Sequence, residues 1–163
     1  MKNLWLLPCL LLFTACSDDD PGTEGDPRIE SENLIGIWHL EPFPAQTELR
    51  ETISYEFFET DTFEVLNSVE DITENQVVGY RYRATGNYSL SGNRLTMDRN
   101  DIYLNNDISG FSATVEELGL STDSWTETVE ITLNGNGNSL TFDYGPCNDT
   151  ANCIGTLTFL RVQ

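Results

Sequence analysis

The chain has 163 residues, enough for one domain with a sizeable core, and its formal charge is −19. Its only lysine is Lys2, and all 27 acidic residues follow Cys16, so the chain beyond that cysteine carries seven arginines and a charge of −20. A surface this acidic repels phosphate backbones, which argues against nucleic acid as a partner, and the lack of lysine excludes amine-based covalent catalysis beyond residue 16.

Residues 1–15 have the features of a bacterial secretory leader. Lys2 provides a positive start, and an apolar run over residues 4–13 is too short to span a bilayer. The ending Leu-Phe-Thr-Ala-Cys over residues 12–16 resembles the lipobox of bacterial lipoproteins. This resemblance implies that Cys16 is acylated and anchors the chain in the lipid bilayer, with an ordinary leader cut after Ala15 as the alternative.

Residues 16–32 are predicted to form a flexible tether behind the lipidated cysteine. The stretch 17–32 contains two prolines, two glycines and seven acidic residues, so it can build no core. Ser-Asp-Asp-Asp directly after Cys16 resembles the acidic export tag of surface lipoproteins of the Bacteroidota type, and a plain soluble spacer is the alternative. We therefore expect a lipid-anchored protein of the cell envelope, at the outer membrane, with its periplasmic or surface side left open.

Residues 33–163 form the predicted folded domain. Short runs rich in aromatics, threonine and valine alternate with Gly/Asn/Asp/Ser clusters, which is typical of an all-β sandwich or barrel. The first strand, residues 33–40, places Trp38 and Gly36 on one face and His39 on the other. We find eight or nine strands, and the remaining ones are expected at residues 52–58, 63–66, 78–90, 95–97, 111–118, 125–133, 140–144 and 155–162.

Turns and loops separate these runs. Tight turns are predicted at residues 91–93 and at Asn-Gly-Asn-Gly over 134–137, and a polar loop is predicted over 99–110. The alternation over residues 78–90 is long for one strand, so we expect a bend between Ala84 and Gly86. No segment shows a convincing helical period.

The two ends of this domain resemble the lipocalin pattern. Gly36-x-Trp38 lies on the first strand and Arg161 on the last, like the lipocalin pair in which the arginine packs over the tryptophan. Residues 88–97, 115–118 and 157–161 are similar in texture to bacterial lipocalin-like envelope lipoproteins. The resemblance implies an up-and-down antiparallel β-barrel of eight to nine strands. Because most members of that family have no known activity, it implies a shape and a location rather than a reaction.

The reactive residue types argue against an enzyme. Cys147 and Cys153 are predicted to pair in an oxidising envelope, closing a short loop that stabilises the fold by about 2 kcal/mol. A zinc site needs more ligands than these two thiols and the lone His39 supply, and no Gly-x-Ser-x-Gly motif exists. We therefore predict no catalytic residue, no metal and no cofactor.

The remaining signal is a set of aromatics predicted to face inward. An eight-stranded barrel is wide enough either to be filled by its own side chains or to hold one small ligand. One hypothesis is an open barrel that binds a small apolar or amphipathic molecule. The other is a filled barrel that acts as a surface or periplasmic interaction module. For the first, the candidate ligand-binding residues are Tyr55, Tyr80, Tyr82, Tyr88 and Trp125.

Overall fold

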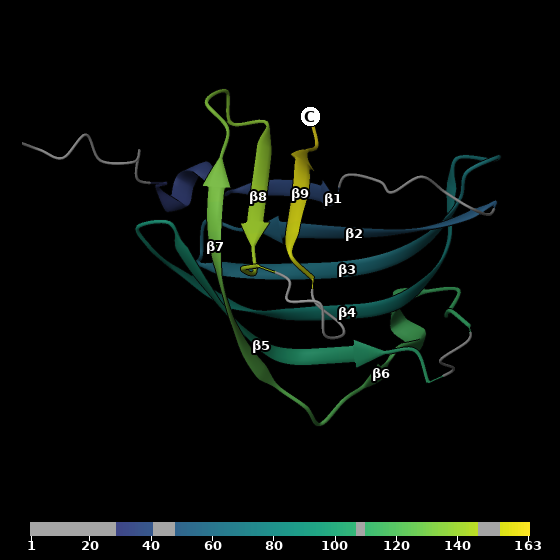
Figure 1. Cartoon of the computed structure of the whole chain (residues 1–163). Coiled ribbons are helices and arrows are strands. Elements are labelled where there is room, and N and C mark those ends of the chain that lie inside the picture. Colours follow the sequence, from purple (N-terminus) through teal and green to yellow (C-terminus); the bar gives the residue numbers. More distant parts are fainter. Residues whose placement is uncertain (1–28, 41–47, 107–109, 147–153) are drawn as a thin grey trace, which may run out of the picture.

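The computed structural model describes residues 29–40, 48–106, 110–146 and 154–163, which form an all-β domain (Figure 1). Apart from two single 3-10 turns, η1 (Ser31–Asn33) and η2 (Val115–Glu117), the secondary structure of these ranges consists of strands. The strands are β1 (Gly36–Leu40), β2 (Leu49–Phe57), β3 (Thr62–Asp71), β4 (Gln76–Ser91), β5 (Arg94–Leu104), β6 (Gly119–Leu120), β7 (Trp125–Leu133), β8 (Ser139–Asp143) and β9 (Thr156–Arg161).

Eight of the strands close into an antiparallel barrel. β1 to β5 pair in sequence order, β5 pairs with β7, and β7, β8 and β9 follow in order until β9 pairs with β1. The two-residue β6 is an additional strand that pairs only with the end of β5. The predicted up-and-down, lipocalin-like antiparallel barrel of eight to nine strands is confirmed.

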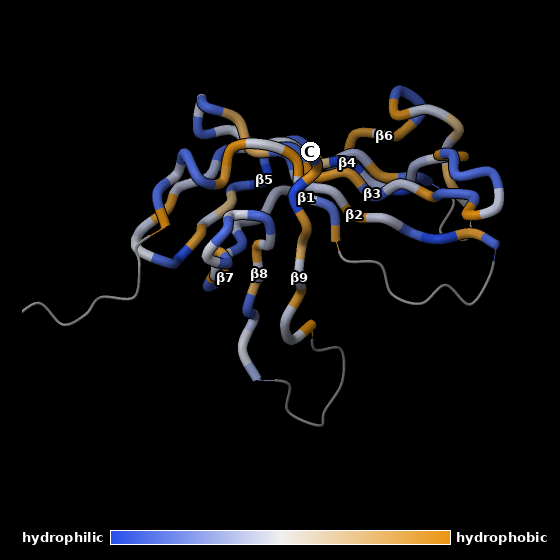
Figure 2. The backbone as a smooth tube through the Cα atoms, turned by 90° about the horizontal axis from the view of Figure 1, so that it is seen from above, coloured by the Kyte–Doolittle hydropathy of each residue, from blue (hydrophilic) through white to orange (hydrophobic). Residues whose placement is uncertain are grey.

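The barrel is flattened, so that two groups of strands cross. β1 to β4 run side by side, and β7, β8 and β9 cross them at a steep angle (Figure 1). Seen from above, β7, β8 and β9 lie on one side of β2, β3 and β4 (Figure 2). The long strands β2, β3 and β4 continue beyond β9, so one end of the sheet is not covered by the crossing strands.

Alternation of buried and exposed side chains along the strands creates most of the core. In β2 the side chains of Tyr55 and Phe57 are buried, and in β3 those of Phe63 and Val65 are buried opposite them. Aromatic rings meet near the middle of the barrel, where the Tyr55 ring lies with its centroid 5.4 Å from those of both Phe142 and Phe159. Burying rings of this size is the main favourable term available to a domain without helices. The fully buried large side chains are Trp38, Phe57, Phe63, Phe142, Phe159, Leu34, Leu95, Met97, Ile102, Ile131, Leu140 and Val69.

Two of the predicted segment assignments are wrong. The predicted polar loop over 99–110 is occupied to Leu104 by β5, because a register shift at Asn100 returns the strand to the core and buries Ile102. The predicted strand over 111–118 is instead one bridge at Ser112 followed by η2. Thr114 and Glu117 form a capping box that starts this turn, a local signal that outweighs the alternation.

The pairing of β4 with its neighbours shifts register in three places, with the extra residue on β5 in one of them and on β4 in the other two. The register of β4 on β5 shifts between Thr85 and Gly86, where the bend was predicted. A Cβ at Gly86 would lie 1.7 Å from the carbonyl oxygen of Asp98, so only glycine lets the two backbones approach there. On the other side of β4, the register with β3 shifts at Asn67/Ser68 and again at Val69/Glu70.

One end of the barrel is closed by Trp38 and Arg161. These two residues pair across β1 and β9, and the guanidinium of Arg161 lies 4.2 Å from the centre of the Trp38 ring. Arg161 donates hydrogen bonds to the carbonyl oxygens of Gly137 and Ile35 at 2.9 and 2.8 Å, and to that of Asn33 at 2.5 Å. The Trp38 indole donates to the carbonyl oxygen of Leu34 at 2.7 Å. We call this set the closed end.

Several predictions lie outside the described residues. These are the leader over residues 1–15, the lipidated Cys16 with most of its tether, and the Cys147–Cys153 disulfide. Within the ranges that the structure describes, no helix has the length and apolar character needed to cross a membrane.

Candidate functional site

The end of the barrel opposite the closed end contains a cavity of about 200 Å³. It lies where β2, β4 and β9 begin and where β3 and β8 end, which in an up-and-down barrel is a single end of the cylinder. Apolar walls come from both crossing layers of the barrel. The lining residues are Ile53, Tyr55, Val65, Asn67, Tyr82, Arg99, Glu127, Tyr144, Ile154, Leu157 and Phe159.

Two charged residues reach this cavity because they occupy positions that alternation assigns to the interior. On β5, Arg99 follows Leu95 and Met97 on the inward face. On β7, Glu127 precedes Val129 and Ile131 on the inward face. Each strand therefore places one charged side chain on its inward face, and pairing of Met97 with Glu127 brings the two charged residues close together.

Arg99, Glu127, Tyr55, Tyr82 and Tyr144 form one hydrogen-bonded network, which we call the polar cluster. Arg99 donates to the hydroxyl oxygen of Tyr82 through Nη1 at 2.7 Å and to that of Tyr55 through Nη2 at 2.8 Å. The same Nη2 donates to Oε2 of Glu127 in an ion pair. Tyr144 donates its hydroxyl proton to Oε1 of Glu127 at 2.6 Å. Strands from both layers are therefore joined by side chains inside the barrel.

The cluster is shielded from water. Arg99 is only 8% exposed, and the side chain of Glu127 is 17% exposed. Burial disfavours the charge of Arg99, but the neighbouring Tyr55, Glu127 and Tyr82 oxygens outweigh it, so the pKa of the guanidinium is raised. A shielded ion pair of this kind is held in place because removing one partner would leave the other charge buried alone.

The tyrosines of the cluster are held in their protonated form. Burial raises the pKa of Tyr55 to about 12, although Arg99 acts in the opposite direction. Burial also raises the pKa of Tyr82, and burial together with Tyr55 and the Glu127 acceptor raises the pKa of Tyr144. All three phenols therefore carry a proton near neutral pH and can act as hydrogen-bond donors.

Aromatic rings also enclose the arginine. The centre of the guanidinium lies 5.2 Å from the Trp125 ring centroid and 6.0 Å from those of Tyr55 and Tyr82. Trp125 in turn stacks on Tyr82 with centroids 6.5 Å apart. The Nε of Arg99 is buried and has no hydrogen-bond partner among the described residues. The site thus combines an apolar cavity, a fixed and neutralised cation, and polar groups with unused hydrogen-bonding capacity.

The structure brings only two of the five candidate ligand-binding residues to the cavity. Tyr55 and Tyr82 line the cavity. Trp125 is 45% exposed and lies on the far side of Arg99, outside the cavity lining. Tyr88 is buried at the closed end, where it packs on Phe57 and donates to the carbonyl oxygen of Phe58 at 3.2 Å.

Tyr80 is displaced by the bulges in β4. Because the register with β3 shifts at Asn67/Ser68, Tyr80 pairs with Ser68, and Gly79 pairs with the buried Val69. A Cβ at Gly79 would meet the ring of Phe111, and Tyr80 is neither in the core nor in the cavity lining. Simple alternation, which places Tyr80 inside and Gly79 outside, is therefore wrong for this part of the strand.

Sequence analysis missed Arg99, Glu127 and Tyr144 as site residues. Arg99 falls in the stretch predicted as a loop, and Glu127 is a charged residue within the predicted strand 125–133. The signal was present, since Arg99 continues the Leu95, Met97 parity and Glu127 shares the parity of Val129. A charged residue at an interior position of a strand is the feature that could have identified them.

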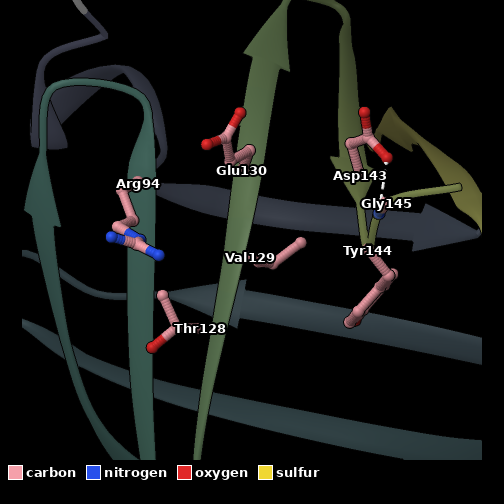
Figure 3. A pocket seen from close by; sticks show the side chains of 7 residues that line it. All are labelled: Arg94, Thr128, Val129, Glu130, Asp143, Tyr144 and Gly145. Atoms are coloured by element: carbon pink, nitrogen blue, oxygen red, sulfur yellow. Dashed lines mark hydrogen bonds between the residues drawn. The ribbon is translucent and has the colours of Figure 1, made fainter.

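A second depression, of about 380 Å³, lies over β5, β7 and β8 (Figure 3). Arg94, Glu130 and Asp143 line it, and they alternate with the buried Leu95, Ile131 and Phe142, so they belong to the outer face of the barrel. The Asp143 carboxylate accepts the amide hydrogen of Gly145 at 2.8 Å (Figure 3). This depression is larger than the cavity, but it carries no buried charged group, so we place the candidate site inside the barrel.

The lone histidine lies apart from the cavity. His39 is exposed on β1, on the face opposite the buried Trp38. Among the described residues, no group of three or more His, Cys, Asp or Glu side chains is arranged to hold a metal ion.

Comparison of the chain with protein-family models, with curated proteins and with solved structures found no match.

Proposed function

We propose that the protein binds a small amphipathic molecule in the cavity at the open end of its barrel. The observation that carries this proposal is the polar cluster, in which a buried arginine with unused donor capacity lies beside an apolar space. Ligand sites in proteins share this composition, with mostly apolar walls and a few fixed polar groups. A barrel needed only as a structural module would gain stability from an apolar filling at the same positions.

The size of the cavity limits the ligand. An engineered cavity of about 150 Å³ holds benzene, so about 200 Å³ accommodates a group of roughly six to eight non-hydrogen atoms. Ile154 is 58% exposed and lies at the edge of the lining, which leaves a path for the rest of a longer chain to reach solvent. The ligand is therefore a short amphiphile or the end of a longer one.

Native mass spectrometry of the protein purified from its own cells tests this proposal. We expect a small molecule to co-purify, and we expect Leu157→Trp to abolish this because the larger side chain fills the cavity. Leu160→Trp is the matched control, since Leu160 is an exposed residue of the same strand. Retention of the same molecule by Leu157→Trp would refute binding in the cavity.

We further propose that acylation of Cys16 holds the barrel at the bilayer of the cell envelope, as the lipobox-like sequence implies. Several acyl chains on one cysteine give an essentially permanent anchor. Cys16→Ala should move the protein from the membrane fraction to the soluble fraction and abolish incorporation of labelled fatty acid. Unchanged labelling would refute the anchor without affecting the proposed cavity.

The second candidate function is a protein-interaction module. It is favoured by apolar side chains that are exposed where the long strands continue beyond the crossing layer. Five such residues on or beside β2 to β6 are Leu49, Ile72, Val77, Leu104 and Leu120. A second polypeptide that co-purifies with the protein, and that is lost in Leu104→Glu but retained in Leu157→Trp, would support this function instead.

A further inference from the structure

We infer that the cavity selects an uncharged hydrogen-bond acceptor on a short apolar chain, such as a ketone, ester or alcohol oxygen, over a carboxylate. We assign the discrimination to Glu127. This inference rests on the proposed function, and it specifies the chemistry of the ligand's polar group.

The charge of Arg99 is already compensated inside the barrel. A lone buried arginine would attract a carboxylate, and this is the usual expectation for an arginine in an apolar pocket. Here the guanidinium is already paired with Glu127, and both side chains are shielded from water. The pair is neutral as a whole, so it gives an incoming anion no net attraction.

The Glu127 carboxylate repels an anionic ligand. An anionic ligand within reach of Arg99 would also lie close to the Glu127 carboxylate, which lines the same cavity. Repulsion between like charges is strong where water is excluded, because the effective dielectric constant is low. The acidic remainder of the chain adds to this, since its formal charge is −19.

The hydrogen-bond donors that a ligand would meet are the hydroxyl groups of Tyr55 and Tyr82. Arg99 donates to the oxygens of Tyr55 and Tyr82, so the hydroxyl hydrogens of these two phenols remain to be donated. Neither hydroxyl has an acceptor of its own among the described residues, whereas Tyr144 already donates to Glu127. The cavity therefore presents two neutral O–H donors that are polarised by a neighbouring cation.

The apolar walls of the cavity match the carbon chain of the ligand. Ile53, Val65 and Leu157 form apolar walls beside the two hydroxyls. A chain with one uncharged oxygen at its inner end satisfies the tyrosines and leaves its carbon atoms against these walls. Burying a charged end there would require loss of its hydration without a free counter-ion.

Isothermal titration with 2-nonanone and octanoate tests the inference, because these molecules have the same chain and differ at one position, a methyl group against an anionic oxygen. At about pH 7 we expect the unmodified protein to bind the ketone at least roughly tenfold more tightly than the carboxylate. In Glu127→Gln the preference should disappear or reverse, because Arg99 then has no counter-ion. Glu130→Gln is the matched control, since Glu130 lies on the outer face of the same strand, and it should keep the original preference.

A measurement on the unmodified protein covers the case in which Glu127→Gln does not fold. Lowering the pH from about 7 to about 4 neutralises most of the octanoate, so its affinity should rise toward that of the ketone, whose own affinity should change little. Equal or tighter binding of octanoate at neutral pH, or an unchanged preference in a folded Glu127→Gln, would overturn the inference while leaving the proposed function intact. Binding of neither molecule to any of the three proteins would overturn both.

Discussion

The two ends of the barrel each contain an arginine among aromatic rings, but the two arginines are bound in different ways. At the closed end, Arg161 lies over Trp38 and donates to three main-chain carbonyl oxygens. At the open end, Arg99 lies among Trp125 and two tyrosines, and its hydrogen-bond acceptors within the described residues are all side chains. The first arrangement fixes backbone segments that are far apart in sequence, and the second fixes groups that face a cavity.

This difference separates a structural arginine from a functional one. Main-chain carbonyl oxygens move only with the backbone, so the hydrogen bonds of Arg161 hold together the segments before β1 and before β8 and are part of the fold. Tyrosine hydroxyls and a carboxylate can change partners when a ligand arrives, so the bonds of Arg99 can be exchanged. The following substitutions test this distinction, from the largest expected effect to the smallest.

The largest effect is expected for Trp38→Ala at the closed end. The indole is fully buried, so its removal should lower the free energy of unfolding by about 3–5 kcal/mol through lost burial and an unfilled space. Trp125→Ala at the open end removes a ring that is 45% exposed and should cost about 1 kcal/mol. Chemical denaturation measures both values. An equal decrease in the free energy of unfolding for the two variants would contradict the difference in burial between the two ends.

Arg99→Met should lower the free energy of unfolding by about 2–4 kcal/mol, because it leaves Glu127 buried without a counter-ion. Adding Glu127→Gln should recover a large part of this loss. Arg161→Met should be destabilising as well, but Glu127→Gln should not compensate for it, since Arg161 is bound to main-chain oxygens. A double-mutant cycle measured by urea denaturation provides the comparison. Independent, additive effects of Arg99→Met and Glu127→Gln would contradict the network.

Stability should fall at alkaline pH because of the polar cluster. The pKa of Tyr55 is raised from 10.0 to about 12, so the unfolded chain loses this proton before the folded chain does. The contribution is complete below about pH 10 and is lost as the pH rises toward 12, by about 2–3 kcal/mol in total. Tyr55→Phe should therefore show a shallower loss of stability between about pH 10 and pH 12 in denaturation experiments. An identical slope in the variant would contradict the burial of this phenol.

The smallest effects are expected for two tyrosine hydroxyls, one at each end. Tyr144→Phe removes a bond to the Glu127 carboxylate and should cost about 1 kcal/mol, whereas Tyr88→Phe removes a bond to a main-chain carbonyl and should cost about 0.5 kcal/mol. Only Tyr144→Phe should change the affinity for the cavity ligand, measured by titration. A change in affinity for Tyr88→Phe would extend the site to the closed end.

The fold was predictable from the sequence because the barrel depends on alternation, and most strands alternate without interruption. The strand 125–133 and the turn over 134–137 lie where they were predicted, since each has a strong local signal in its residues. The predictions failed where the backbone departs from alternation. The bulges near Tyr80 reverse the faces of β4, and a bulge depends on the neighbouring strand as well as on the residues of its own strand.

Two of the five residues of the polar cluster were predictable from the sequence. Tyr55 and Tyr82 were identified because aromatic residues on an inward face are expected to be buried. Arg99 and Glu127 were missed because a charged residue is usually assigned to solvent, and the two are 28 positions apart in sequence. Their contact depends on the pairing of β5 with β7, which skips over β6, and no local pattern specifies that pairing.

The pairing of β5 also has a consequence for how this chain can change in length. The first part of β5, up to Arg99, closes the barrel against β7, and the last part pairs with the extra strand β6. The strand β6 is therefore paired to the barrel, but the barrel closes without it. Because β6 does not close the barrel, a peptide inserted beside β6 should leave the pairing of β5 with β7 intact.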